Sequence, residues 1–155
     1  MTGPYYSIDN FYPRNSAGYL LKRVHKLIHQ RMEDLCEKEA ISFTQWVVLA
    51  LLCSGTASTA AELSREVGHD AGAMTRVIDQ LETLGLLTRE RDLEDRRIVK
   101  LRMTPEGKAQ FDALSPTIID LWNGLFEGFE TVEIDAFIGT LRTLLNRLEP
   151  SEGEK

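Results

Sequence analysis

The pattern of apolar and polar residues predicts a mainly helical chain. Apolar residues recur at three- and four-residue steps between residues 20 and 35 and between residues 134 and 148, the period of one helix face. Residues 46–53 are apolar nearly all round, which predicts a central buried helix ending near Gly55. A long helical region is also expected at about 106–126.

Capping patterns mark where the middle helices begin. Ser42 and Gln45, and likewise Thr59 and Glu62, have the spacing of a capping box, in which each side chain bonds to the other residue's amide. The second box predicts a helix at 60–67 closed by Gly68, and Asp70 can cap the next helix, at 71–84, which Gly85 stops. Two short helices joined by a tight glycine-containing turn indicate a helix-turn-helix.

Two strands are predicted next, at 86–91 and 98–103, the second with clean alternation of side chains. A charged hairpin loop at 92–97 joins them. Thr104 and Pro105 then begin the long helix. Pro116 should kink or divide that helix, because proline lacks an amide hydrogen and clashes with the preceding turn.

This order predicts the fold class: mainly α with a small β-hairpin wing, a winged helix-turn-helix core flanked by N- and C-terminal helices. The first and last helices each carry an apolar stripe that one chain of this size cannot cover, so pairing about a two-fold axis is expected. The predicted organisation is an aromatic arm (1–15), an N-terminal dimerisation helix (16–41), the winged helix-turn-helix (42–104), C-terminal dimerisation helices (105–149) and a polar tail (150–155).

Composition narrows the class of protein. The 155 residues are 43% hydrophobic, as in soluble globular proteins. No apolar run is long enough to cross a bilayer, and the N-terminus lacks a secretory pattern. Two cysteines cannot form a disulfide scaffold, so a reduced cytoplasm is expected. We find no catalytic motif and expect neither an enzyme nor a resident cofactor or metal.

The net charge of −6 at first argues against nucleic acid, but its distribution favours it. Residues 109–155 hold 9 acidic and 3 basic side chains, whereas residues 89–102 hold 6 basic and 4 acidic ones. Salt screens charges beyond about 8–10 Å, so the distant acidic segment need not cancel this basic strip.

Two segments could contact DNA. The helix at 71–84 begins with small residues, which allow close approach to phosphate, and it turns Thr75, Arg76 and Gln80 away from its apolar stripe. Arg96 and Arg97 at a protruding hairpin tip suit a narrow minor groove. The ordinary alternatives are a surface arginine paired with Asp79 or Gln80 and a solvated cluster of weak ion pairs.

The chain resembles the MarR family of bacterial regulators over roughly residues 16–148. The resemblance lies in the run from Met74 to Leu86 and in Asp92-x-x-Asp95-Arg96-Arg97, followed by Leu101-x-x-Thr104-x-x-Gly107. It implies a homodimeric repressor that binds double-stranded DNA and is released by a small aromatic or phenolic ligand. By position it implies the following roles: Arg97 in the minor groove, Asp95 as its orienting partner, Arg96 as a second wing contact, Ala73, Thr75, Arg76 and Gln80 on the recognition helix, and Ser58 and Thr59 at phosphates.

An effector pocket is expected between the DNA-binding core and the dimerisation helices. An aromatic wall and a cation for a carboxylate or phenolate are available there, although ordinary packing explains each residue equally well. The candidate lining residues are Tyr19, Arg23, His29, Phe43 and Trp46.

Three alternatives stay open. His25 and His29 form half of a metal site, with no third ligand apparent. Cys36 and Cys53 could make the chain a thiol-based redox regulator of the same fold. Both, however, fall near the C-termini of predicted helices, where the helix dipole disfavours a thiolate. The peroxide-sensing branch of the family that the chain resembles carries its cysteine early in the first helix, and no cysteine lies there in this sequence. The chain could also be a winged-helix module for protein contact that binds no DNA.

Overall fold

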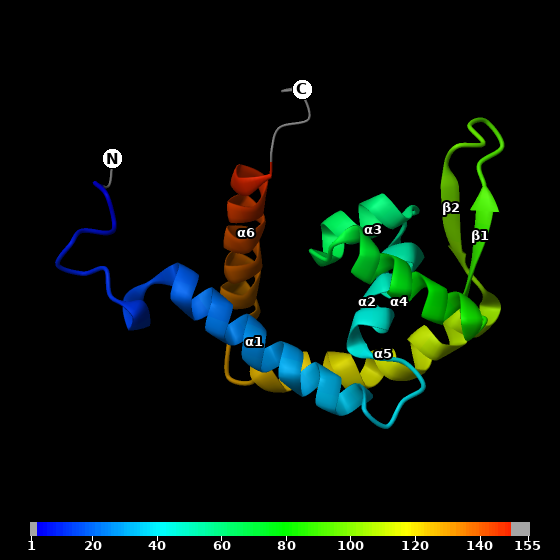
Figure 1. Ribbon diagram of the computed structural model, residues 1–155. Helices are drawn as coiled ribbons and strands as arrows, with labels where there is room; N and C mark the ends of the chain where they lie inside the picture. Colours follow the sequence, from blue (N-terminus) through cyan, green and yellow to red (C-terminus); the bar gives the residue numbers. More distant parts are fainter. Residues whose placement is uncertain (1–2, 150–155) are drawn as a thin grey trace. The chain divides into compact units, whose positions relative to one another are not determined.

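The computed structural model describes residues 3–149 of the chain. Its elements follow the predicted order of helices and a hairpin (Figure 1). No helix within these residues is long and apolar enough to cross a membrane. The elements are η1 (Pro13–Asn15), α1 (Ala17–Cys36), α2 (Phe43–Ser54), α3 (Ala60–Val67), α4 (Ala71–Thr83), β1 (Leu87–Arg91), β2 (Val99–Met103), α5 (Pro105–Leu125) and α6 (Thr131–Leu148).

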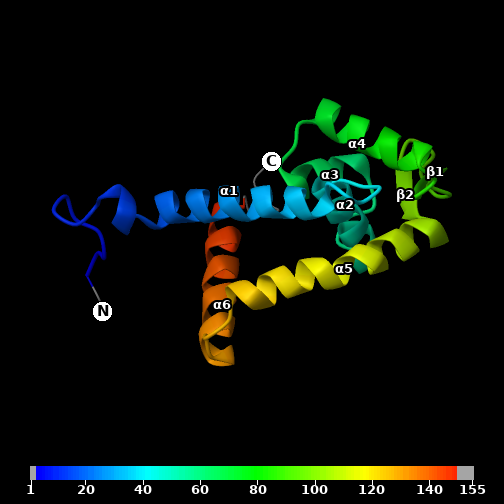
Figure 2. The same cartoon turned by 90° about the horizontal axis from the view of Figure 1, so that it is seen from below.

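The chain forms two compact units, Met1–Ile118 and Ile119–Lys155. In the first unit, α4 packs on α2 and α3 (Figure 2), and the strands pair at the end of α4. The core of this unit is apolar and fully buried, since Val48, Leu63 and Ile78 from the three helices are almost inaccessible to solvent. The winged helix-turn-helix predicted from the sequence is confirmed as the fold.

The predicted capping signals are confirmed at three helix starts. Ser42 and Thr59 each form a complete capping box, and Asp70 accepts a hydrogen bond from the Ala73 amide at 2.8 Å. Gly55 and Gly68 end α2 and α3 with left-handed φ angles of 71° and 73°, which favour glycine. The local sequence therefore determines where the helix-turn-helix bends.

The hairpin is antiparallel, with Arg89 opposite Leu101 and Arg91 opposite Val99. It projects from the helices beside α4 (Figure 1). The Leu101 amide donates to the Ser58 carbonyl at 2.7 Å, which ties β2 to the segment before α3. This hydrogen bond attaches the wing to the helices through β2, while the loop at its tip extends away from them (Figure 1).

A close backbone contact explains the spacing of Thr104 and Gly107. The Thr104 hydroxyl donates to the Gly85 carbonyl at 2.7 Å and accepts from the Gly107 amide at 3.0 Å. A Cβ atom at Gly107 would lie 2.0 Å from the Leu86 carbonyl oxygen. Only glycine therefore lets α5 approach the turn between α4 and β1.

Of the two outcomes expected at Pro116, a kink or a division, the structure excludes the division, since α5 runs without a break through the proline. Proline removes one helical hydrogen bond, but Leu114 and Ile118 on either side are buried and hold the helix to the core. Packing therefore outweighs the lost bond.

The segment before α1 is more ordered than a plain arm. It contains the 3-10 turn η1 near its end, and the Tyr6 ring meets the rings of Tyr5 and Phe11 edge to face at 4.9 and 5.0 Å. The Tyr6 hydroxyl accepts from the Ala17 amide at 2.8 Å, which fixes the cluster to the start of α1. The polar tail predicted at 150–155 lies outside the described residues.

The second unit contains the end of α5 and all of α6. Its aromatic residues stack locally, with the ring centroids of Trp122 and Phe126 5.8 Å apart. α6 has no buried residue, although it carries an apolar seam that includes Phe137 and Leu145.

Candidate nucleic-acid interface

The helix α4 has one face in the core and one in solvent. Met74, Ile78 and Leu81 are buried, whereas Thr75 and Arg76 are exposed. Arg76 forms no ion pair within the described part of the chain. The alternative that Arg76 is held by Asp79 is not observed, so its guanidinium is available to a partner.

Three further predicted residues of α4 differ in what they can offer. The Ala73 amide is already bound by Asp70, and Ala73 is half-buried. The Thr75 hydroxyl donates to the Ala71 carbonyl at 2.7 Å, which leaves its oxygen as an acceptor. Gln80 is exposed, but its Oε1 accepts from Nε2 of Gln45 at 3.0 Å.

Gln45 fixes the orientation of Gln80. Its own Oε1 accepts from the Ser42 amide at 2.9 Å, so its Nε2 must be the atom that donates to Gln80. Gln80 therefore turns its carbonyl oxygen to the protein and leaves only its amino group as a donor. Bidentate pairing with adenine needs both groups, so this geometry disfavours Gln80 as an adenine contact.

Arg89 of β1 connects the wing to the end of α4. Its guanidinium pairs with Asp79 and Glu82, one turn apart on the helix. Hydrogen bonding to Asp79, followed by the charge of Glu82, raises the pKa of Arg89 above its ordinary value. The single positive charge of Arg89 offsets one of these two negative charges. The sequence offers no local signal for this contact, because ten residues separate Arg89 from Asp79.

The wing loop is ordered by two aspartates. Asp92 Oδ1 accepts from the amides of Glu94 and Asp95 at 2.9 and 3.0 Å, and its other oxygen pairs with Lys100. The hydrogen bond from Lys100, followed by those two amides, lowers the pKa of Asp92 from 3.8 to about 2.

Asp95 acts on the backbone rather than on a guanidinium. Its Oδ1 accepts from the Arg97 amide at 3.0 Å. The guanidinium groups of Arg96 and Arg97 form no ion pair within residues 3–149 and are exposed. The expectation that Asp95 holds the Arg97 guanidinium is therefore not met; it fixes the turn that presents both arginines.

Ser58 and Thr59 lie at the start of α3, where Glu62 occupies most of their donors. Its Oε2 accepts from the Ser58 amide at 2.7 Å, the Ser58 hydroxyl at 3.1 Å and the Thr59 amide at 3.0 Å. These bonds, with the Ser58 amide foremost, lower the pKa of Glu62. The Thr59 hydroxyl accepts from the Glu62 amide at 3.3 Å.

Three of the five predicted pocket residues lie together. His29, Phe43 and Trp46 form a row of rings with centroids 5.7 and 6.0 Å apart. Phe111 of α5, which the sequence did not indicate, continues the row at 5.4 Å from Trp46 and accepts the indole hydrogen bond on its carbonyl oxygen. The row thus joins α1, α2 and α5.

Tyr19 and Arg23 lie elsewhere on α1, where the Arg23 guanidinium is 3.5 Å from the Tyr19 hydroxyl. His29 Nδ1 is buried without a hydrogen-bond partner and lies 3.9 Å from a Glu33 oxygen. His25 and His29 have ring centroids 6.0 Å apart, and no third metal-binding side chain joins them in the described residues.

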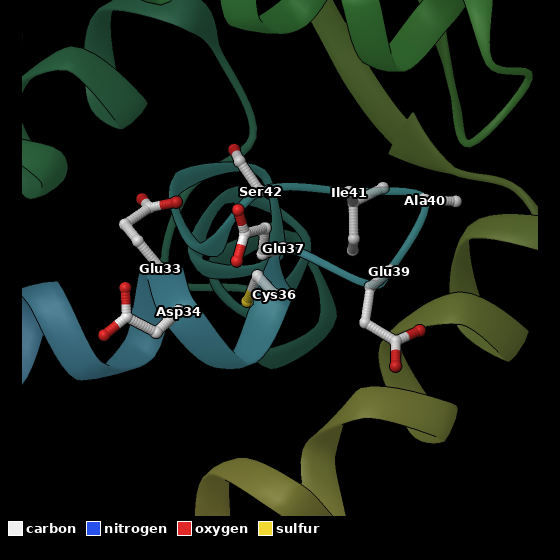
Figure 3. A pocket seen from close by; sticks show the side chains of 8 residues that line it. All are labelled: Glu33, Asp34, Cys36, Glu37, Glu39, Ala40, Ile41 and Ser42. Carbon is white, nitrogen blue, oxygen red and sulfur yellow. The ribbon is translucent and has the colours of Figure 1, made fainter.

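Two cavities within the described residues are lined by other side chains. One, of about 560 Å³, lies against the wing. The other, of about 420 Å³, lies between the end of α1 and the start of α2 (Figure 3). Four carboxylates and the Cys36 thiol line the second cavity. Burial, followed by the charges of Glu33 and Glu39, raises the pKa of Cys36 to about 11.

The arrangement defines a winged helix-turn-helix protein with an exposed arginine on its second helix and two at its wing tip. Residues 41–99 match the MarR family. The uncharacterized HTH-type transcriptional regulator YdgJ of Bacillus subtilis is 33% identical over 95 residues, which are 61% of this chain and 56% of YdgJ.

The organic hydroperoxide resistance transcriptional regulator of the same organism is 27% identical over 99 residues, 64% of this chain and 67% of that one. Among solved structures, BpsR of Bordetella bronchiseptica, studied for regulation of its DNA binding by 6-hydroxynicotinic acid, is 25% identical with a TM-score of 0.73. The match covers 92% of this chain and 97% of BpsR. The winged helix-turn-helix of the chain is therefore similar to that of MarR-family regulators.

Proposed function

We propose that the chain is a sequence-specific DNA-binding transcriptional regulator, a homodimeric repressor that a small aromatic or phenolic ligand releases from its operator. The observation that carries the proposal is that the guanidinium groups of Arg76, Arg96 and Arg97, which α4 and the wing loop present to solvent, form no ion pair within residues 3–149. Similarity to the MarR family supplies the context in which such groups contact DNA.

In this proposal α4 lies in the major groove and the wing in the adjacent minor groove. Arg76 contacts base edges or phosphate, and Thr75 serves as an acceptor. Arg97 enters the minor groove, where narrow A·T-rich sequence strengthens the negative potential. Arg96 and the Thr59 hydroxyl contact backbone phosphates. Gln80 contributes only amino donors, and Ser58 acts by shaping the start of α3.

Exposed apolar side chains support the dimer. Leu20, Val24 and Leu27 form an exposed stripe on α1, and the apolar seam of α6 finds no cover within its own unit. Contiguous apolar surface of this kind favours association. A two-fold dimer implies a pseudo-palindromic operator with half-sites about 10 bp apart.

The row from His29 to Phe111 supports an aromatic ligand. Its rings come from three helices, and the orphaned His29 Nδ1 offers a polar contact beside them. The 6-hydroxynicotinic acid reported for BpsR has this chemistry: an aromatic ring with polar substituents. A releasing ligand must bind the DNA-incompetent state more tightly.

The redox alternative has less support here. A reactive cysteine needs a stabilised thiolate, whereas Cys36 is buried with a pKa of about 11 and lies at the C-terminal end of α1. Cys53 is exposed at the C-terminal end of α2, away from any helix N-terminus that would activate it.

The test begins with selection of bound sequences from a random duplex pool, with and without aromatic acids. On the selected operator, Arg97→Ala should weaken binding about 5- to 150-fold and relax the preference for A·T pairs beneath the wing. Arg14→Ala, which removes an exposed arginine of η1, should have no such effect. Failure of the wild-type protein to bind any duplex at low salt would instead favour a protein-interaction module.

A further inference from the structure

Leu93 occupies an unusual position at the wing tip. It is 98% exposed, the highest value among the large apolar side chains of residues 3–149. Its neighbours in the loop from Asp92 to Arg97 are all charged. A hairpin tip does not need a leucine to turn. The exposed side chain therefore suggests contact with another molecule.

Hydrogen bonds within the loop keep the Leu93 side chain from turning toward the core. Asp92 binds the amides of the two residues that follow Leu93, at 2.9 and 3.0 Å. Across the turn, the Ile98 amide donates to the Asp95 carbonyl and the Asp92 amide donates to the Ile98 carbonyl, both at 2.9 Å. These bonds hold the backbone on both sides of Leu93 and direct the side chain outward.

The charges around Leu93 favour DNA over a protein partner. Arg96 and Arg97, three and four positions after Leu93, form no ion pair within residues 3–149, and Lys100 offsets the charge of Asp92 beside Leu93, while Glu94 remains a negative neighbour. One leucine among charges is too small an apolar surface for a protein docking site. An apolar side chain on the same loop as two unpaired arginines matches the minor groove, whose sugar walls lie between two rows of phosphates, and leucine is one of the wedge residues used there.

We propose that Leu93 is an apolar wedge that enters the minor groove and partly unstacks one base step. The proposal rests on the proposed DNA-binding function and adds a specificity determinant to it. Pyrimidine–purine steps such as TA and CA unstack most easily, so Leu93 makes the operator prefer such a step beneath each wing without any hydrogen bond to a base.

The experiment compares wild type with Leu93→Ala, Leu93→Met and Ile8→Ala on duplexes that differ only at the step beneath the wing. Ile8, in the N-terminal arm and 94% exposed, provides the matched control for loss of an exposed apolar side chain. We expect Leu93→Ala to bind the TA duplex about 5- to 20-fold more weakly and to lose the preference for TA over AA. The salt dependence should stay unchanged because no charge is removed.

A fluorescent base analogue reports unstacking directly. With 2-aminopurine at the step, wild type and Leu93→Met should increase the fluorescence, whereas Leu93→Ala should not. Equal step preference and equal fluorescence in wild type and Leu93→Ala, with both bound to the operator, would overturn the wedge and leave the DNA-binding proposal standing. Failure of wild type to bind any duplex would overturn both.

Discussion

Replacement of Gly107 by alanine tests whether the base of the wing depends on a close backbone contact. The new Cβ would lie 2.0 Å from the Leu86 carbonyl oxygen and 2.9 Å from Met103 Cγ. Ordinary contacts begin near 3.4 Å, so α5 must move by more than 1 Å. That movement lengthens the hydrogen bond of 3.1 Å from the Thr104 amide to the Leu86 carbonyl.

The expected loss of folding stability is the sum of three contributions. Overpacking costs about 1–3 kcal/mol, here near the upper end because the clash is with backbone. Weakening the buried hydrogen bond adds about 0.5–1.5 kcal/mol, and the better helix propensity of alanine returns up to about 1 kcal/mol. The net destabilisation is about 2–3 kcal/mol, which lowers Tm by roughly 5–10 °C for a chain of this length.

Thermal unfolding followed by circular dichroism, at one fixed protein concentration, measures this change. Gly124→Ala is the matched control, since it lies on the same helix with no atom within 4 Å of the added Cβ. It should leave Tm unchanged or raise it slightly. A Tm for Gly107→Ala at or above that of wild type would refute the role assigned to the close contact.

The other predictions concern thiol reactivity and the wing carboxylate. With an aromatic disulfide reagent at pH 8, Cys53 should react rapidly and Cys36 only on unfolding, because Cys36 is buried with a pKa of about 11; rapid labelling of folded Cys53→Ser would contradict this. NMR titration of the wing amides should give a pKa of about 2 for Asp92. Because this pKa lies below the ordinary 3.8, the contribution of Asp92 to folding is complete above about pH 4 and is lost as the pH falls toward 2. Lys100→Gln should raise that pKa, and an unchanged value would exclude Lys100 as the main cause.

Local sequence patterns predicted the helix boundaries because the residues that determine each helix end lie close together in the chain. The capping boxes at Ser42 and Thr59 and the left-handed glycines at Gly55 and Gly68 involve residues within four positions of one another. Pro116 does not divide α5, and this could not be predicted from local patterns, because burial of Leu114 and Ile118 against the rest of the unit holds the helix in place.

The site was predictable only in part, for the same physical reason. The sequence located the exposed arginines of α4 and the wing, but not which partners their neighbours use. The contact of Gln45 with Gln80 spans 35 positions, and that of Trp46 with Phe111 spans 65. Such pairs leave no spacing signal, so the restricted donor set of Gln80 and the extended aromatic row emerge only from the packed structure.

The ion pairs also show how a chain with a net charge of −6 can present positive charge at the proposed DNA contact. Of the six basic residues between positions 89 and 102, three are engaged: Arg89 with α4, Lys100 with Asp92, and Arg102 with Glu90 at 2.6 Å. These pairs stabilise the wing and offset negative charges of carboxylates that would repel phosphate. The remaining three, Arg91, Arg96 and Arg97, have no ion-pair partner within residues 3–149 and lie at or near the tip. Two of the four acidic residues of the strip, Asp92 and Glu90, are thus offset by Lys100 and Arg102. The three arginines then face only Glu94 and Asp95, so positive charge still prevails near the tip.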